Sequence, residues 1–493
     1  MSKMARTSAT SGNLKLLVGG KWVDSSSEVS HDVFNPASGE SLGRVPFSTH
    51  EEVSSAVEAA AAAFESWRQV PITERAQYLF RMKNVLEANV DELARLNTLN
   101  HGKTLEESRG DLKRTIENVE AAIAVAYTLA KGNNLDQISP GIDSEVSKDP
   151  LGVFSIICPF NFPIMIPFWF IPYAIVLGDT VVVKPSDVTP VPMQRVSELL
   201  EEFVKLPKGV YNMVHGAADV SQDLIKESAI KGVTFVGSTP VARQIYKLAG
   251  EHGKRAIVNG GAKNSIVVTP SADLATSVPP IVSSFFGNTG QRCLAGANLI
   301  AVGDVKKAVL EKFVRASTSL KIGSGLDQGT QMGPVVTEAA KKRILGYLQA
   351  GTEEGAKVVA DGRGVVVKEY PGGYYLGATI FDEVSPDMKI AKEEIFGPVA
   401  ATIQTETLDE AIGQINKGTN FGNMASLFTT KGGEAREFRR QVRAGNIGIN
   451  IGVAAPSAYF PFGGMRESFF GVLHPQMDSV DFFTDRKVTI SRW

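Results

Sequence analysis

One cysteine of the chain has a setting that suits nucleophilic chemistry. Cys293 lies in the segment FFGNTGQRCLAG, with Gly287 and Gly290 before it and Arg292 beside it. A neighbouring guanidinium favours a thiolate, so we expect Arg292 to lower the pKa of the Cys293 thiol. The alternative is a small buried hydrophobe, which is the commoner role of a lone cysteine. That packing role is predicted for Cys158, which lies within the apolar segment SIICPF.

Three further segments carry residues that suit a redox or acyl-transfer site. Asn161 in PFNFP could donate a hydrogen bond to a developing oxyanion, although a loop asparagine more often makes a turn. Lys184 and Asp187 in KPSD follow the apolar run TVVV and suit the ribose hydroxyls of a nucleotide. The Asp187 carboxylate would repel a 2′-phosphate, which favours NAD over NADP. Gly237 and Ser238 in FVGSTPVA lie between a strand and a helix whose N–H groups could bind a pyrophosphate.

The segments around these residues alternate between strand and helix from residue 151 onward. The strand-like runs are GVFSIICP, TVVVKPS, GVYNMVHG, GVTFVGS and AIVNGG, and the helical patterns between them are PFWFIPYAIVLG, MQRVSELLEEFVK, SQDLIKES and PVARQIYKLAGEHG. This alternation predicts βαβ units and a parallel sheet, in which ligands bind beyond the carboxyl ends of the strands. Asn161, Lys184 and Gly237 each follow a strand, so we expect them at one edge of the sheet.

Other patterns flank this region. Residues 13–50 predict an N-terminal β-meander, and residues 51–131 predict three helices, the second ending at Asn100–Gly102 and the third spanning about 104–130. A second α/β run begins near Ser265. The closing segment VDFFTDRKVTISRW is strand-like, and a strand at a chain end needs a sheet to join, so we expect it to pair with another subunit.

Length and composition limit the class of function. A chain of 493 residues is too long for one compact core, so two or more domains are expected. Fifty-one basic and 53 acidic residues give a net charge of −2, which offers no electrostatic reason to expect nucleic acid or a membrane surface as a partner. Two cysteines are too few for a disulfide framework or a thiolate metal cluster, and the six histidines are scattered. We therefore expect no metal and a reducing, cytoplasmic compartment.

The first twelve residues, MSKMARTSATSG, are basic and rich in serine and threonine. A short disordered tail is the favoured interpretation. The alternative is a remnant of an organelle-targeting segment, which would place a eukaryotic protein in the mitochondrial matrix.

Six short motifs together carry a resemblance that none carries alone. PFNFP, KPSD, FVGST, GQRC, EEIFGPV and PFGGMRES occur in this order and at spacings that resemble the aldehyde dehydrogenase superfamily. The resemblance extends from about Val18 to the C-terminus. It implies an α/β fold with a Rossmann-type cofactor domain, an α/β catalytic domain and a small β-extension for oligomerisation.

The resemblance also implies domain boundaries and residue roles. It assigns 13–131 and 151–259 to NAD binding, 260–462 to catalysis, and 132–150 with 479–493 to oligomerisation as a homodimer or homotetramer. Cys293 matches the nucleophile that forms a thiohemiacetal and then a thioester, and Asn161 matches the oxyanion donor. Asp187 stands where many members have glutamate. The residues matching cofactor-binding positions are Phe160, Lys184, Asp187, Gly237, Ser238, Glu394 and Phe396.

The chain departs from the superfamily at residue 259. Where the common pattern is E-L-G-G-K, this chain reads N-G-G-A-K, which places Asn259 at the position of the glutamate that activates water for deacylation. Asparagine cannot accept a proton near pH 7. A thiol acceptor does not need that base, because it is partly ionised and intrinsically nucleophilic. The departure therefore predicts an acylating enzyme with coenzyme A as cosubstrate.

The GQRC, GAKN and SFFG…DFFT segments are similar to the methylmalonate-semialdehyde dehydrogenase branch. That branch oxidises methylmalonate or malonate semialdehyde to propionyl- or acetyl-coenzyme A and releases carbon dioxide. The substrate carboxylate needs a cation, and the resemblance implies Arg114 and Arg292, since a guanidinium binds carboxylate through two parallel bonds. For Arg114 the alternative is a solvated helix face with Glu117 within reach, and Arg109 is a competing candidate.

Two other functions stay open at this point. One is a hydrolytic NAD-dependent aldehyde dehydrogenase for another small aldehyde, with a different base in place of Asn259. The other is a non-catalytic binding or structural protein on the same fold, which the joint presence of Cys293, Asn161, Lys184 and Glu394 disfavours.

Overall fold

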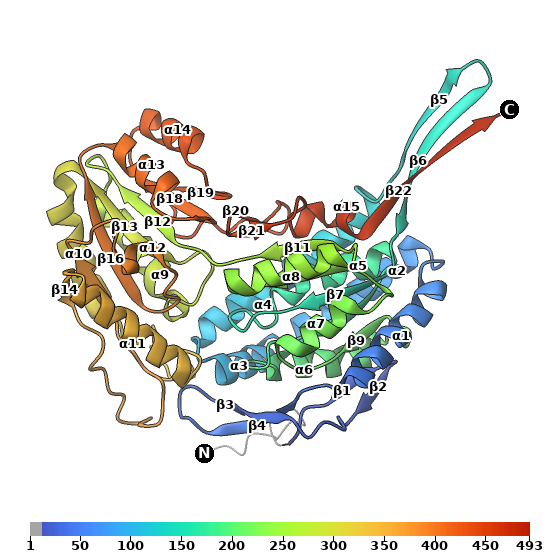
Figure 1. The fold of residues 1–493 in the computed structure, drawn as a ribbon, viewed down its shortest axis with the longest axis horizontal. Coiled ribbons are helices and arrows are strands. Elements are labelled where there is room, and N and C mark those ends of the chain that lie inside the picture. The colour runs from blue at the N-terminus through green and yellow to red at the C-terminus, as the bar shows by residue number, and fades with distance from the viewer. Residues whose placement is uncertain (1–11) are drawn as a thin grey trace.

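The computed structural model describes residues 12–493, so the predicted N-terminal tail lies almost entirely outside the described residues. Figure 1 shows two α/β bodies side by side and a narrow extension that projects from one of them. The predicted α/β fold class is confirmed.

The first sheet contains the strands predicted between residues 151 and 261. Its members are β1 (Leu16–Val18), β2 (Lys21–Val23), β7 (Val153–Ile157), β8 (Thr180–Lys184), β9 (Tyr211–Met213), β10 (Ile230–Val236), β11 (Arg255–Asn259) and β21 (Phe469–Phe470). They lie in the order β2-β1-β9-β8-β7-β10-β11-β21. Pairing is parallel from β9 through β11, as predicted, and antiparallel at both edges. β7 and β8 are buried along their whole length, because helices cover both faces.

Helices pack on both faces of this sheet. They are α1 (His50–Trp67), α2 (Ile72–Ala88), α3 (Val90–His101), α4 (Leu105–Tyr127), α5 (Ile171–Leu177), α6 (Val191–Leu199), α7 (Ala218–Lys226) and α8 (Thr239–Glu251). Apolar residues of α1, α7 and α8 share a core with Val153 and Ile157, whereas those of α2, α4, α5 and α6 share one with Phe154 and Ile156. Alternate residues of β7 therefore face opposite layers.

Two predicted helix boundaries differ in the structure. The single second helix is replaced by α2 and α3, which meet at Asn89. Asn89 has non-helical backbone angles, and its side chain donates to the carbonyl of Val85 (2.7 Å), a local bond that competes with helix continuation. The third helix, α4, is slightly shorter than predicted.

The second sheet follows the second predicted α/β run. Its strands are β12 (Asn264–Val268), β13 (Gly296–Val302), β14 (Lys357–Ala360), β15 (Thr379–Asp382), β16 (Val399–Thr405), β18 (Met424–Phe428) and β19 (Asn446–Ile449), in the order β14-β15-β16-β13-β12-β18-β19. The helices of this body are α9 (Leu274–Phe286), α10 (Lys306–Thr318), α11 (Glu338–Glu353), α12 (Lys389–Lys392), α13 (Leu408–Lys417) and α14 (Gly432–Gln441). Two small ribbons, β3 (Ser30–Phe34) with β4 (Ser41–Pro46) and β17 (Phe421–Gly422) with β20 (Met465–Arg466), lie outside the sheets.

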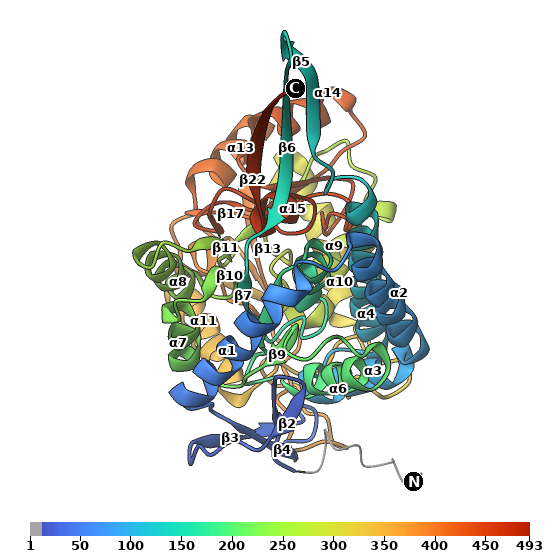
Figure 2. The ribbon, with the colours of Figure 1, turned by 90° about the vertical axis from the view of Figure 1, so that its right-hand side faces the viewer.

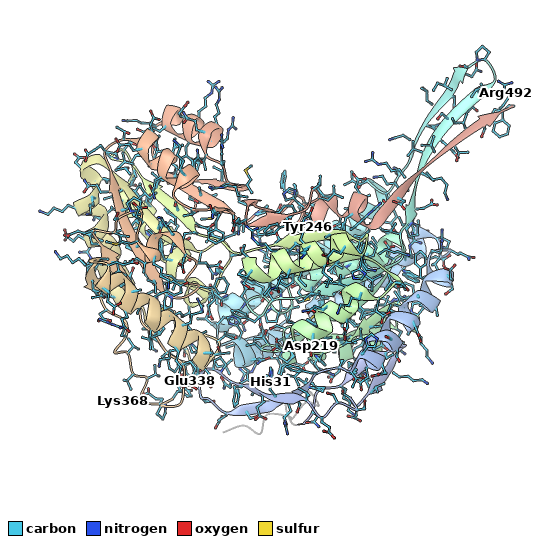
Figure 3. All side chains as sticks on the ribbon, viewed as in Figure 1. His31, Asp219, Tyr246, Glu338, Lys368 and Arg492 are labelled. Carbon is cyan, nitrogen blue, oxygen red and sulfur yellow. The ribbon has the colours of Figure 1, made fainter. Side chains whose placement is uncertain are left out.

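The extension is a three-stranded antiparallel sheet. Its strands are β5 (Asn133–Ser139), β6 (Ile142–Pro150) and β22 (Thr484–Arg492), in the order β22-β6-β5. It stands away from both bodies in Figure 1, its tip is the uppermost part of the view in Figure 2, and Figure 3 labels Arg492 near this tip.

The closing segment is not a strand throughout. Residues 479–483, predicted as strand, form the short helix α15 (Ser479–Phe483). Helical turning brings Phe482 and Phe483 together against Phe154, with ring centroids 5.3 and 4.5 Å away, and anchors the base of the extension in the core. Within residues 12–493 no helix is long and apolar enough to cross a membrane.

Candidate active site

Cys293 lies on a distorted loop between α9 and β13. Asn288 and Thr289 have left-handed backbone (φ 52° and 55°), and Gly290 has φ 72°. A Cβ on Gly290 would lie 2.1 Å from the carbonyl oxygen of Gly397, so a side chain cannot be accommodated there. The loop reverses direction where a regular helix would continue, and it thereby presents Cys293 at the start of β13.

Two amide side chains fix the backbone at Cys293. Its carbonyl oxygen accepts hydrogen bonds from Nδ2 of Asn264 (2.8 Å) and Nδ2 of Asn423 (2.9 Å), which lie at the starts of β12 and β18. This loop, residues 287–295, is called the nucleophile loop after the role predicted for Cys293, and it is tied to two neighbouring strands of the second sheet.

The electrostatics of the Cys293 thiol differ from the prediction. Burial raises its pKa to about 12, and the nearby carboxylate of Glu394 acts in the same direction. The guanidinium of Arg292 opposes them, but its effect is the smallest of the causes. The prediction that Arg292 gives this thiol a lowered pKa is therefore wrong, because the cost of ionising a buried thiol outweighs one guanidinium that is already paired with Glu107.

Cys293 opens into a cavity of about 80 Å³. At a liquid-water share of about 30 Å³ per molecule, this space suits a substrate with few heavy atoms. The cavity joins apolar walls to two arginines and two amides; its lining residues are Arg114, Asn118, Phe162, Met165, Trp169, Arg292, Cys293, Leu294, Val453, Ala455, Pro456, Ala458, Phe462 and Gln476.

The two predicted carboxylate-binding arginines both line this cavity, and each has a carboxylate partner. Arg114 pairs with Glu117 (Nη1–Oε2, 2.7 Å) and is about half exposed. Arg292 pairs with Glu107 (Nη2–Oε1, 2.9 Å) and is largely buried. Arg109, the competing candidate, instead forms an exposed ion pair with an aspartate of α3 and is not among the cavity-lining residues of the described chain.

Helix α4 supplies a polar stripe to the site. Glu107, Asp111, Arg114 and Asn118 recur at steps of four, three and four residues, which places them on one helix face. The helix begins with a capping box, in which the Thr104 hydroxyl accepts from the Glu107 N–H (3.2 Å) and the Glu107 carboxylate accepts from the Thr104 N–H (3.0 Å). Glu107 therefore serves the helix end and Arg292 at once.

The predicted oxyanion donor lies beside the nucleophile loop. Asn161 is buried, and its Nδ2 donates to the carbonyl of Gln291 (3.2 Å). The ring of Phe160 meets that of Phe396 edge-on, with centroids 5.7 Å apart. The PFNFP, GQRC and EEIFGPV motifs, far apart in the sequence, thus converge between the two sheets.

Residues predicted for a nucleotide lie at the carboxyl edge of the first sheet. Lys184 ends β8 and donates to the carbonyl of Gly216 (2.8 Å). Asp187 follows, and its carbonyl hydrogen-bonds with Nε2 of His31, a residue of the β3–β4 ribbon that Figure 3 labels. Ser238 caps α8 without a side-chain hydrogen bond; Pro240 has no N–H, so the first-turn donors of this helix that remain for a phosphate are the N–H groups of Thr239 and Val241.

Glu394, one of the predicted cofactor-binding residues, lies close enough to the Cys293 thiol to raise its pKa. Its Oε1 accepts from the N–H of Ala262 (2.8 Å), and burial raises its pKa to about 7. Burial also lowers the pKa of the neighbouring Lys263 to about 7. Both groups line a second, smaller cavity behind the nucleophile loop.

Asn259 ends β11, next to the turn at Gly237. It is buried, its carbonyl accepts from the N–H of Gly237 (3.1 Å), and its Nδ2 has no partner among the described residues. No group of three or more His, Cys, Asp and Glu side chains within residues 12–493 is placed to hold a metal ion.

Comparison with known proteins matches residues 22–489 to the aldehyde dehydrogenase family. The chain belongs to this family. Among aldehyde dehydrogenases, it is 46% identical to a malonate-semialdehyde dehydrogenase of Geobacillus kaustophilus over 481 residues, which cover 97% of this chain and 99% of the relative. A similar enzyme of Halalkalibacterium halodurans is 45% identical over 486 residues, 98% of this chain and 99% of that one.

Solved aldehyde dehydrogenase structures share the whole fold. A methylmalonate-semialdehyde dehydrogenase of Oceanimonas doudoroffii superposes with a TM-score of 0.95 at 39% identity, over 98% of each chain. A protein of Sinorhizobium meliloti, solved in complex with NAD, also gives 0.95, at 37% identity over 98% of each chain. The expected aldehyde dehydrogenase fold is therefore confirmed.

Several residues at this aldehyde dehydrogenase site were not predicted from the sequence. Lys103, Asp111 and Glu107 form a charged group behind Asn161, and Asn264 and Asn288 hold the nucleophile loop. The polar stripe on α4 was a usable signal for Asp111 and Glu107. Asn264 stood in the quoted GAKN motif, but its type alone gave no role.

Proposed function

We propose that this aldehyde dehydrogenase oxidises malonate or methylmalonate semialdehyde with NAD, releases carbon dioxide, and transfers the remaining acyl group to coenzyme A. For malonate semialdehyde the balanced reaction consumes the semialdehyde anion, NAD⁺ and the thiol, and yields acetyl-coenzyme A, carbon dioxide and NADH. The names of the relatives described above support this substrate class.

The observation that carries the proposal is the cavity at Cys293. It is small, largely apolar, and lined by two guanidinium groups in addition to the thiol. A substrate with an aldehyde at one end and a carboxylate at the other can meet Cys293 and an arginine together. Arg292, which is largely buried, would bind more strongly than the half-exposed Arg114, because less water screens it.

Cys293 and Asn161 perform the acyl chemistry in this proposal. The Cys293 thiol gives its proton to water and its sulfur bonds to the aldehyde carbon, while the carbonyl oxygen becomes an oxyanion. Asn161 has two Nδ2 hydrogens, and one donates to Gln291, so the second can donate to that oxyanion together with the Cys293 N–H. Loss of hydride from the same carbon then leaves a Cys293 thioester. When the carboxylate leaves as carbon dioxide, the carbon that carried it takes up a proton from water, which balances the proton released by the thiol.

NAD, when bound, accepts the hydride at its nicotinamide ring. The open N-terminus of α8 fits the pyrophosphate, with Gly237 and Ser238 at the turn. Lys184 and Asp187 would hold the adenosine ribose, and the Asp187 carboxylate disfavours a 2′-phosphate. Phe160, Glu394 and Phe396 would lie at the nicotinamide end; the edge-on contact of the two phenylalanine rings and the hydrogen bond of Glu394 to Ala262 support this assignment.

Asn259 directs the thioester to a thiol rather than to water. Its amide cannot remove a proton from water near pH 7, so hydrolysis lacks the base that the family's glutamate supplies. Coenzyme A provides its own ionisable thiol, which attacks the thioester carbon and releases the Cys293 sulfur.

The decisive experiment identifies the products with and without coenzyme A. We expect sustained NADH formation from malonate semialdehyde only when coenzyme A is present, with acetyl-coenzyme A and carbon dioxide as coproducts. Equal steady-state rates without coenzyme A, with a free acid as product, would instead establish the hydrolytic alternative. Propanal serves as the substrate control, because it lacks the carboxylate.

We further propose a homodimer or homotetramer joined through the extension. β5 and β22 carry exposed apolar side chains, Leu135 and Ile138 on β5 and Val488 and Ile490 on β22, which a second copy would cover. Light scattering of the full chain and of L135D/V488D tests this, since the charged variant should be monomeric. Both cysteines are free thiols, which suits a reducing, cytoplasmic setting.

A further inference from the structure

Lys103 is a lysine whose side chain has no exposed surface. Its Nζ donates to the backbone carbonyl of Asn161 (2.7 Å) and pairs with Oδ2 of Asp111 (3.2 Å). It also lies 4.3 Å from the ring centroid of Phe162. The ammonium group therefore touches Asn161 and the residue that follows it, directly behind the carboxamide that we assign to the oxyanion.

Asp111 completes this contact from helix α4. Its Oδ1 accepts from the N–H of Met165 (3.0 Å), and its Oδ2 accepts from Nδ2 of Asn97 (2.9 Å). Asp111 thus holds the far end of the segment from Asn161 to Met165 directly, and Lys103 holds its near end. Together the two charged groups fix both ends of this segment, residues 161–165, which we call the oxyanion loop.

A second donor joins this loop to the nucleophile loop. Nδ2 of Asn288 lies 3.4 Å from the Asn161 carbonyl and 3.1 Å from the Gln291 carbonyl. Because Nδ2 of Asn161 also donates to Gln291, the carboxamide of Asn161 has little freedom to turn. Its unused N–H therefore keeps one direction.

Stability alone does not account for a charged pair at this depth. Burial lowers the pKa of Lys103, and the carboxylates of Asp111 and Glu107 oppose that effect. A buried ion pair generally stabilises a fold no more than well-packed apolar residues of the same volume. What this pair adds is a fixed geometry for the loop that it holds.

We infer that Lys103 and Asp111 are positioning residues for catalysis: their buried ion pair aims the Asn161 carboxamide at the carbonyl oxygen of the substrate. This inference rests on the oxyanion role proposed for Asn161. The pair should affect the rate of chemistry and leave cofactor binding unchanged, since neither residue lies at the carboxyl edge of β8 or at the N-terminus of α8.

The test compares neutral replacements that keep the shape of the pair. K103M/D111N removes both charges at once, so that no unpaired charge stays buried, and Asn at 111 can still accept from Met165. K103Q/D111N keeps a neutral donor at position 103. N161A and the triple variant N161A/K103M/D111N complete a mutant cycle. The control is K306M/D382N, which neutralises another poorly exposed Lys–Asp pair (3.0 Å) at the end of β15, away from the cavity.

Each variant is assayed for folding, for NAD affinity, and for the single-turnover rate of NADH formation with malonate semialdehyde. K103M/D111N should lower that rate about 10- to 100-fold, because a small displacement of a catalytic group costs this much. K103Q/D111N should lose less. The KM for NAD should stay within about twofold, and the triple variant should be no more than about threefold slower than N161A. The control pair should match the wild type.

The outcomes separate the two proposals. An unchanged rate in N161A removes the oxyanion role itself, whatever the pair does. A slow N161A together with a wild-type rate in K103M/D111N, or with multiplying losses in the triple variant, overturns the positioning role alone. If both pair variants fail to fold while the control folds, the pair is a folding determinant and the inference is wrong.

Discussion

The two cysteines of the chain lie in regions that give their thiols the same resting acidity but different access. Burial raises the pKa of Cys158 and of Cys293 to about 12 in each case. Cys158 follows β7 inside the core, with Sγ 3.6 Å from the carbonyl of Ile156 and Lys184 nearby. Cys293 instead lines the substrate-sized cavity. Access and a rigid loop, rather than a lowered resting pKa, therefore distinguish the proposed nucleophile.

The backbone around the two cysteines also differs, in conformation and in hydrogen bonding. Cys158 continues a strand, and its N–H bonds to the carbonyl of Lys184. Cys293 lies after left-handed residues, and its carbonyl is held by Asn264 and Asn423. Left-handed backbone at a residue other than glycine is costly and persists where the surroundings enforce it. In this chain the strained left-handed residues come just before Cys293, the cysteine that lines the cavity.

Removing each thiol gives the largest expected contrast. C293A should lower kcat for NADH formation by about 10⁴-fold or more, because no group replaces the covalent step. C158A should keep kcat and lose only about 1 kcal/mol of unfolding free energy through a small cavity. Steady-state assays with urea unfolding measure both. Substantial activity in C293A, or its loss in well-folded C158A, would break the comparison.

Substitution of the two cavity arginines tests whether the cavity beside Cys293 recognises the substrate carboxylate. R292K should lower kcat/KM for malonate semialdehyde about 30- to 100-fold, because lysine cannot form the paired bonds of a guanidinium. R114K should lose less, since Arg114 is half exposed. Propanal, which has no carboxylate, should be affected only a few-fold by either change. R109K is the matched control, because Arg109 lies on the same helix as Arg114 but does not line the cavity. Equal losses for both aldehydes would contradict carboxylate recognition.

Alkylation should distinguish the thiols by access and by charge. At pH 7 without cofactor, iodoacetamide should label Cys293 slowly and Cys158 more slowly still, since both thiols are protonated. Labelling of Cys293 should still be rising steeply at pH 10, because burial raises its pKa to about 12. NAD⁺ should accelerate it about tenfold or more, because the positive nicotinamide ring favours the thiolate. Mass spectrometry of each peptide gives the rates, and an NAD⁺ effect of equal size at Cys158 would argue against local action.

The sequence predicted the elements and motif residues, but not the contacts between them. Strand–helix alternation placed Asn161 and Lys184 correctly at strand ends, because local patterns decide such elements. The bond from Lys103 to Asn161 spans 58 positions and has no local signature. The pKa of Cys293 was predicted in the wrong direction because the adjacent Arg292 is visible in the sequence, whereas burial is not. The break at Asn89 and the helical turn at 479–483 depend likewise on side-chain contacts.

The smallest expected effect is the alkaline loss of stability from the two buried thiols. Below about pH 8.5 the thiols are protonated in both the folded and the unfolded chain, so they contribute no pH dependence. Above that value the unfolded chain releases protons that the folded chain retains, because burial raises both folded pKa values to about 12. The unfolding free energy should therefore fall by about 1 kcal/mol per thiol between pH 8.5 and 9.5.

Urea unfolding of the wild type, C158A and C293A over this range separates the two contributions. Each single variant should show about half of the thiol-dependent slope. If C293A keeps the full wild-type fall of unfolding free energy with pH, then only Cys158 has a raised pKa in the folded chain. Cys293 would then reach solvent in the resting enzyme, and its thiolate would form without help from bound NAD⁺.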